Sequence, residues 1–189
     1  MKLLFSTIVT TALIFAAEKP IVNEEPEASS TVAHFTTEAS FGYASPFYLD
    51  IDKDGINDFS FQTVSYGDQG NVYTKYLVIP MNKNQVMHVE DMAAITEAGE
   101  VISEKLPRGN VHWSGAHAEI IESSYDGASM KWNGTWSGGR GQYLGIQLVK
   151  DGKQYLGWVR IEVSPQTEKA YVKEYAINRQ AGEQLTASL

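Results

Sequence analysis

The chain has 189 residues, contains no cysteine and carries a formal net charge of −8 at pH 7. An acidic protein is repelled by nucleic-acid phosphates and by anionic membranes, so nucleic acid is excluded from the partners that we expect. Without cysteine no disulfide can form, and stability must come from the core, from a bound ion, or from both. The length is that of one ordinary domain.

The opening segment, residues 1–17, is predicted to be a secretory signal peptide. Its sequence MKLLFSTIVTTALIFAA places Lys2 before an apolar run that ends in the small residues Ala16 and Ala17. The run is too short to cross a bilayer comfortably, because a spanning helix needs about 20 apolar residues. We therefore expect an exported protein, periplasmic, on the cell surface or secreted, without membrane insertion of the mature chain. A retained N-terminal anchor is the alternative interpretation.

The segment 18–32, EKPIVNEEPEASSTV, is rich in Glu, Pro, Ser and Ala and is predicted to be a flexible leader. From residue 33 to residue 189 the chain is aromatic and β-branched, with turn residues at about every 8 to 15 positions. This spacing is typical of a sheet protein. The predicted fold is a single all-β domain, an antiparallel β-sandwich of jelly-roll or lectin-like type with one short helix.

The segment 50–58, DIDKDGIND, matches the pattern DxDxDGxxD. Alternate residues of a tightly wound loop point inward, so Asp50, Asp52 and Asp54 can surround one cation, while the glycine at the sixth place permits the sharp turn. The carbonyl of Ile56 and the carboxylate of Asp58 complete the predicted ligand set. Carboxylates this close repel one another strongly without a cation between them. The pattern predicts a Ca²⁺ site, and a solvated acidic turn is the alternative.

Strands are expected on both sides of this loop. The sequences SPFYL before it and FSFQTV after it have the alternating apolar pattern of strands. The helix-loop-helix calcium motif needs a glutamate at the twelfth place, where this chain has Phe61. We therefore expect a calcium-filled turn between two strands, with a dissociation constant on the order of 10⁻⁴ to 10⁻³ M or somewhat tighter. A fully ligated ion offers no open position for a reactive water, so its predicted role is structural.

Residues 89–100, VEDMAAITEAGE, have a helical pattern. Met92, Ala93 and Ile95 would face the core, and Gly99 would end the helix. This segment supplies the one short helix of the predicted fold.

The histidines and acidic residues between 112 and 122 do not match a zinc or catalytic pattern. His112 and His117 lie five apart, whereas zinc sites favour a spacing of four on a helix or two on a strand. Glu119 and Glu122 would face opposite sides of a strand, which argues against their acting as a catalytic pair. No cysteine nucleophile and no G-x-S-x-G turn occurs in the sequence. The sequence predicts no catalytic residue, although a carboxylate pair elsewhere in the chain stays open.

Aromatic residues gather around glycine-rich loops. The sequence HWSGAH contains Trp113, and KWNGTWSGGRGQY contains Trp132, Trp136 and Tyr143. Many carbohydrate-binding modules hold sugars with loops of this composition on a β scaffold, by stacking the sugar on aromatic rings. The alternative is that the tryptophans fill the open ends of a sandwich.

A β-hairpin is predicted over residues 142–163, QYLGIQLVKDGKQYLGWVRIEV. The dipeptide Asp151-Gly152 suits a type I′ turn, because both central residues of that turn need positive φ. The numbers of opposed residues then sum to 303. One face of the hairpin is apolar and belongs in the core; it carries Leu144, Ile146, Leu148, Val159 and Ile161.

The other face of this hairpin is more polar and places Trp158 opposite Gly145. In a structural interpretation, the indole covers the bare backbone of Gly145 and Arg160 stacks on Tyr143. In a functional interpretation, Trp158 and Tyr143 form an aromatic platform for a sugar or another ligand.

Two resemblances follow from these motifs. The DxDxDGxxD loop resembles the calcium loops of integrin-type β-propellers and of many bacterial surface proteins, which implies ligand roles for residues 50–58 only. The overall layout resembles small exported proteins of Gram-negative bacteria, in which such a loop precedes a stretch like AITEAGEVI, here 94–102, and a closing block YLGIQL…YLGWVRIEV…VKEYAIN, here 143–177. The second resemblance implies a fold and a location and gives no reaction.

Three classes of function are compatible with these features. The first is a secreted or cell-surface binding module without catalysis, with a glycan or another cell-surface ligand on the tryptophan loops. The second is a structural or adhesive surface protein whose only ligand is Ca²⁺. The third is a glycoside hydrolase that uses carboxylates in a cleft.

Overall fold

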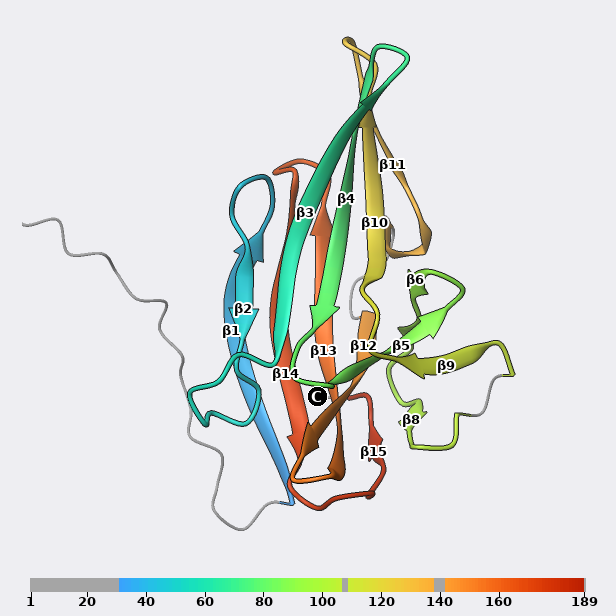
Figure 1. Cartoon of the computed structure of the whole chain (residues 1–189). Coiled ribbons are helices and arrows are strands. Elements are labelled where there is room, and N and C mark those ends of the chain that lie inside the picture. Colours follow the sequence, from blue (N-terminus) through green and yellow to red (C-terminus); the bar gives the residue numbers. More distant parts are fainter. Residues whose placement is uncertain (1–30, 107–108, 138–141, 189) are drawn as a thin grey trace, which may run out of the picture.

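A computed structural model describes residues 31–106, 109–137 and 142–188 (Figure 1). The predicted signal peptide, residues 1–17, lies outside the described residues, as do residues 18–30 of the predicted leader and residues 138–141 of the glycine-rich loop. The described residues include no helix with the length and apolar character of a membrane span.

Strands make up most of the described chain. In order they are β1 (Val32–Phe41), β2 (Phe47–Leu49), β3 (Phe59–Asp68), β4 (Asn71–Pro80), β5 (Gln85–Val89), β6 (Met92–Ala93), β7 (Ile95–Thr96), β8 (Val101–Ile102), β9 (Val111–Ser114), β10 (Ala118–Tyr125), β11 (Met130–Asn133), β12 (Gln142–Lys150), β13 (Lys153–Ser164), β14 (Lys169–Asn178) and β15 (Leu185–Thr186). A single 3₁₀ turn, η1 (Thr135–Ser137), is the helical element of the described residues.

Thirteen strands form one sheet in the order β1-β14-β13-β12-β5-β6-β10-β4-β3-β2, with β7, β9 and β11 attached to β12, β5 and β10. β15 and β8 form a separate two-stranded sheet. The strand pairs are antiparallel except for the short contact between β6 and β10. The predicted all-β antiparallel fold is confirmed.

The large sheet folds back on itself, so that β3 and β4 pass in front of β13 and β14 in Figure 1, with residues of all four strands in one core. Phe41 at the end of β1 packs on Phe61 of β3 and on Tyr76 of β4, with ring centroids 5.4 and 6.1 Å apart. The hydroxyl of Thr63 donates to the carbonyl of Gly42 at 3.2 Å, so the two edges of the sheet nearly meet. The main hydrophobic core fills the space between the two halves.

The hairpin of β12 and β13 has the predicted register. Tyr143 pairs with Arg160 and Leu144 with Val159, and both turn residues, Asp151 and Gly152, have positive φ. The predicted core face is buried in the main core. Local turn chemistry therefore determined this hairpin, as the dipeptide indicated.

The opposite face of the hairpin is also buried, which corrects the expectation of a polar face. The residues of this face and those that cover it form a second hydrophobic cluster, drawn from β5, the residue between β6 and β7, β8, β12, β13, β14, β15 and the residue after β15: Met87, Ala94, Ile102, Tyr143, Leu156, Trp158, Ala176, Leu185 and Ala187. Segments distant in sequence cover this face, and the alternation within the hairpin carries no information about them.

Met87, and not Trp158, occupies the space over Gly145. A Cβ built on Gly145 would lie 2.1 Å from the sulfur of Met87. Trp158 instead meets the ring of Tyr143 edge-on, with centroids 5.0 Å apart, and Arg160 forms an ion pair with Glu174 in place of the expected stacking on Tyr143. The buried carboxylate of Glu174 attracts the guanidinium more strongly than the aromatic ring does.

The helix expected over residues 89–100 is wrong, because this segment contains the last residue of β5 and the short strands β6 and β7, with turns at residues 90–91 and 98–99. Met92 pairs with Val89 of β5 and Ile95 pairs with Leu144 of β12. Glu90 has a φ of 54°, which is incompatible with a continuous right-handed helix. Pairing with distant strands has overridden the local helical pattern.

Candidate metal centre

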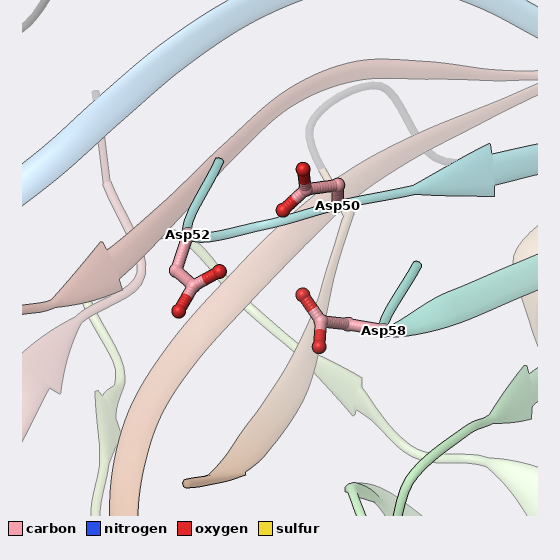
Figure 2. A group of neighbouring side chains, drawn as sticks. All are labelled: Asp50, Asp52 and Asp58. Atoms are coloured by element: carbon pink, nitrogen blue, oxygen red, sulfur yellow. The ribbon is translucent and has the colours of Figure 1, made fainter. Parts of the chain in front are cut away.

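The acidic loop, residues 50–58, connects β2 to β3. Figure 2 shows that the carboxylates of Asp50, Asp52 and Asp58 point toward one another, and one oxygen from each lies within 4.8 Å of the others. The loop can bring them together because β2 and β3 pair directly, with Leu49 opposite Phe59. The two ends of the loop are therefore fixed side by side.

Backbone amides of the loop hold Asp50 in place. The N–H groups of Asp54 and Gly55 donate to its two carboxylate oxygens, at 3.2 and 2.8 Å. Gly55 has a φ of 91°, in the region that favours glycine, as the sixth place of the pattern requires. The loop conformation is thus stabilised by one of its own acidic side chains.

Asp58 is the buried member of the group, with 5 % of its surface exposed. Burial raises the pKa of its carboxyl, although hydrogen bonds from the Ile51 N–H and the Asn84 side chain oppose the shift, and nearby Asp52 and Asp50 raise it further. The Ile51 N–H donates at 2.9 Å and Asn84 Nδ2 at 3.2 Å. A cation beside this carboxylate would favour its charged form.

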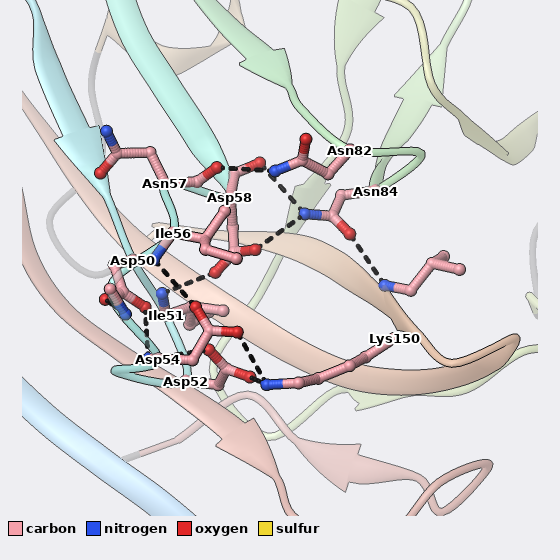
Figure 3. A network of polar contacts seen from close by, with 12 residues as sticks. Asp50, Ile51, Asp52, Asp54, Ile56, Asn57, Asp58, Asn82, Asn84 and Lys150 are labelled. Atoms are coloured by element: carbon pink, nitrogen blue, oxygen red, sulfur yellow. Dashed lines mark hydrogen bonds and ion pairs between the residues drawn. The ribbon is translucent and has the colours of Figure 1, made fainter.

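Lys150 brings a positive charge to the loop from the end of β12 (Figure 3). Its ammonium donates to Asp52 Oδ2 at 2.6 Å and to Asp54 Oδ2 at 2.8 Å. These carboxylates raise the pKa of Lys150, and the hydrogen bond from Lys150 lowers the pKa of Asp54. In this structure the ammonium partly neutralises the acidic group.

Three converging carboxylates can hold a metal ion at this loop. The ligand atoms are all oxygens, which suits a hard cation. Ion pairs and hydrogen bonds also connect the loop to parts of the chain that are far from it in sequence. A bound ion would therefore stabilise those parts as well as the loop.

Two of the five predicted ligand residues lie outside the acidic group in this structure. The carboxylate of Asp54 accepts from Lys150 and from the Ile56 N–H at 2.9 Å. The side chain of Ile56 is exposed. A ligand role for the Ile56 carbonyl and for Asp54 stays a prediction.

Sequence reasoning missed three contacts between the loop and distant parts of the chain. Asn84 lies 26 residues beyond Asp58, and Lys150 lies 98 residues beyond Asp52, so no local pattern connects them. Lys53 places its ammonium 5.3 Å from the ring centroids of both Phe35 and Tyr175, on β1 and β14. The backbone of Lys53 has a φ of 63°, in the left-handed region that non-glycine residues adopt only rarely.

The aromatic candidates do not form one surface. Trp136, Tyr143 and Trp158 are buried, with exposures of 1, 3 and 2 %, so their ring faces are covered by protein. Trp136 belongs to the main core, and Tyr143 and Trp158 belong to the second cluster.

The other two tryptophans are half-buried. Trp132 packs on Tyr76 with ring centroids 5.3 Å apart, against the main core. Trp113 donates from Nε1 to the carbonyl of Ser103 at 3.3 Å and packs against the second cluster. For these residues the packing favours the structural interpretation.

Glu119 and Glu122 lie on the same side of β10, which corrects the expectation of opposite sides. Both approach Lys75 Nζ, at 2.7 and 4.0 Å. The pairing of β10 with β4 shifts between Glu119 and Ile121, and such an irregularity resets the alternation of side chains.

Comparison of the chain with protein-family models, with curated proteins and with solved structures finds no match.

Proposed function

We propose that this chain is an exported, non-catalytic surface protein whose β fold is stabilised by Ca²⁺ bound at the acidic loop. The observation that carries the proposal is the convergence of Asp50, Asp52 and Asp58 within a loop of complete DxDxDGxxD spacing. The resemblance of this loop to integrin-type calcium loops, and of the whole chain to small exported proteins of Gram-negative bacteria, belongs to the same proposal.

Calcium suits the site better than a transition metal does. Ca²⁺ takes six to eight oxygen ligands, and carboxylates, a backbone carbonyl and water are the donors within reach. Asp54 and the carbonyl of Ile56 would complete the shell once the ion, and not Lys150, neutralises the carboxylates. The ion would then hold the ends of β2 and β3 together. Through Asp58, which accepts from Asn84, it would also be connected to β12.

Between the two non-catalytic classes, burial of the aromatic residues supports a structural or adhesive protein. A glycan stacks on an accessible ring face, and Trp136, Tyr143 and Trp158 offer little accessible surface. A ligand of such a protein would contact its outer surface and not a tryptophan platform.

The test is thermal unfolding of the protein in excess EDTA and then in millimolar Ca²⁺. A ligand that binds only the native state at 100 times its dissociation constant stabilises it by about 2.7 kcal/mol. For a protein of this size we expect the melting temperature to rise by about 5 to 10 °C. Asp52→Asn should abolish the rise.

Asp68→Asn, at the exposed end of β3, is the matched control and should retain the full rise. An equal rise in Asp52→Asn would place the calcium elsewhere. No rise in the unmodified protein would mean that the acidic group is only a solvated turn neutralised by Lys150.

A further inference from the structure

A groove of about 770 Å³ lies where β3, β4 and β10 meet β5 and β9. Its apolar lining comes mainly from β3 and β4, and its polar and charged lining comes from these strands, from β5, β9 and β10, and from the turns that precede β6 and β10. It is separate from the acidic loop, since none of residues 50–58 lines it.

Three of the four histidines of the chain line this groove. His88 of β5 is paired directly with His112 of β9, and their ring centroids lie 5.7 Å apart. His117 precedes β10 and lines the same groove. Two strand pairings and a loop thus bring together imidazoles that are 5 to 29 residues apart in the sequence.

The groove also has an excess of negative charge. Glu90, Asp91 and Glu119 line it, and the only lysine or arginine among its lining residues is Lys75, which pairs with Glu119 at 2.7 Å. With neutral histidines, three carboxylates and one ammonium leave a formal charge of −2. Such a surface attracts cations.

We propose that this groove binds a first-row transition-metal ion such as Zn²⁺, with the imidazoles of His112 and His117 as its ligands. The ring of His88 lies beside them in the wall of the groove. Imidazole nitrogen is a preferred ligand of Zn²⁺, Cu²⁺ and Ni²⁺, whereas Ca²⁺ takes oxygen. The two sites therefore differ in ligand chemistry, and this inference does not depend on calcium at the acidic loop.

Binding requires the exposed imidazoles to turn toward a common point. Among the described residues, the group of three metal-ligating side chains whose ligand atoms already lie within 4.8 Å of one another is Asp50, Asp52 and Asp58, and it contains no histidine. His112 and His117 are exposed, and exposed side chains change rotamer in picoseconds to nanoseconds.

His88 is 3 % exposed and is held by Nε2 at 3.3 Å from the Ala116 carbonyl, which is longer than a usual hydrogen bond. That ring is fixed in the wall of the groove, so His112 and His117 must supply the movement.

The experiment is a Zn²⁺ titration of the protein in excess Ca²⁺, followed by NMR of the imidazole ring nitrogens and by calorimetry. Excess Ca²⁺ keeps Zn²⁺ away from an oxygen site. We expect the ring nitrogens of His112 and His117 to shift on saturation, while those of His34 stay unchanged. His112→Gln and His117→Gln should each weaken Zn²⁺ binding at least about tenfold, since loss of even an outer partner of a metal ligand has that effect.

His34→Gln is the matched control, because His34 lies outside the groove and pairs with Glu174 at 3.1 Å. It should bind Zn²⁺ as tightly as the unmodified protein. Equal Zn²⁺ affinity in the His112→Gln/His117→Gln double variant, or ring-nitrogen shifts confined to His34, would overturn the proposal. An absence of any Zn²⁺ binding would overturn it as well, whatever the result of the calcium experiment.

Discussion

Lys150 is a built-in counter-ion of the acidic loop. Its ammonium contacts the carboxylates of Asp52 and Asp54 and comes from the last residue of β12. An arriving Ca²⁺ would compete with this ammonium for the same oxygens, because both neutralise the same group of charges.

Lys150→Met should therefore have opposite effects on the free and the calcium-bound protein. Without Ca²⁺ the variant should melt at a lower temperature, since the carboxylates lose their neutralising charge. Its Ca²⁺ affinity should be a few-fold tighter, because no ammonium has to be displaced. Calorimetric titration with Ca²⁺ measures the affinity, and weaker binding by the variant would show that Lys150 supports the ion instead of competing with it.

Tyr76 joins the two halves of the sheet by one hydrogen bond. Its hydroxyl donates to the Glu168 carbonyl at 2.8 Å, from β4 to the turn before β14. Burial raises the pKa of Tyr76 to about 12. Between pH 10 and about pH 12 the unfolded chain therefore loses this proton while the native chain keeps it, and the contribution of Tyr76 to stability falls as the pH rises.

Tyr76→Phe should be less stable than the unmodified protein at neutral pH by about 1 to 2 kcal/mol, because the Glu168 carbonyl loses its donor. The difference between the two proteins should shrink above pH 10. Urea unfolding at neutral pH and at about pH 11 measures both effects. The other tyrosines titrate in both proteins, so their effects on the stability difference cancel. A stability difference that grows with pH would contradict the raised pKa of Tyr76.

At the level of the strand, two glycines of the central hairpin each leave room for a neighbouring atom, which is a backbone oxygen in one case and a side-chain sulfur in the other. A Cβ on Gly157 of β13 would lie 2.5 Å from the Ala176 carbonyl oxygen, which belongs to the backbone of β14 and cannot move aside. A Cβ on Gly145 of β12 would meet the sulfur of Met87, the flexible part of a side chain.

Gly157→Ala should consequently destabilise the protein by about 3 kcal/mol, at the upper end of typical overpacking costs, and Gly145→Ala by about 1 kcal/mol. Urea unfolding measures both values: if the slope of the unfolding free energy against urea concentration is unchanged, the shift of each midpoint gives the loss of stability. Equal costs would mean that β13 and β14 can separate as easily as Met87 can rotate.

On the scale of the whole molecule, Asn84 connects the acidic loop to β12. Its Nδ2 donates to the carbonyl and to the carboxylate of Asp58, both at 3.2 Å, and its Oδ1 accepts from the Val149 N–H at 2.8 Å (Figure 3). Asn84 is 1 % exposed, so these bonds form away from water. An ion that orders Asp58 should therefore stabilise β12 as well.

Hydrogen exchange at the Val149 amide measures this connection. If opening of the Asn84 bridge requires loss of the ion, Ca²⁺ at 100 times its dissociation constant should slow the exchange by up to about 100-fold. The Ser129 amide, which donates to Asp126 at the distant β10–β11 turn, is the control and should not change. Equal effects at both amides would indicate global stabilisation, and Asn84→Ala should remove the effect at the end of β12.

The sequence predicted those features that depend on neighbours in the chain. Asp50, Asp52 and Asp58 were found because alternation and one glycine bring their side chains together locally. The register of β12 and β13 followed from the two positive-φ residues of their turn. The all-β class followed from the frequency of turn residues and the abundance of β-branched and aromatic side chains.

Other expectations failed where a distant segment decided the outcome. Residues 89–100 form strands because β5, β10 and β12 offer edges for pairing. Glu119 and Glu122 share a side because β10 shifts its register against β4. Trp158 is buried because β8, β15 and Met87 cover a face that alternation alone marked as polar.

By itself the sequence determined the fold class, the central hairpin and the acidic residues of the loop, since turn geometry and side-chain alternation act over a few residues. Only the tertiary structure decided which ring faces are covered, that Asn84 and Lys150 reach the acidic loop, and that three histidines share one groove. Burial and electrostatic pairing depend on the proximity of segments far apart in the chain, and that proximity is fixed only when the whole sheet has folded.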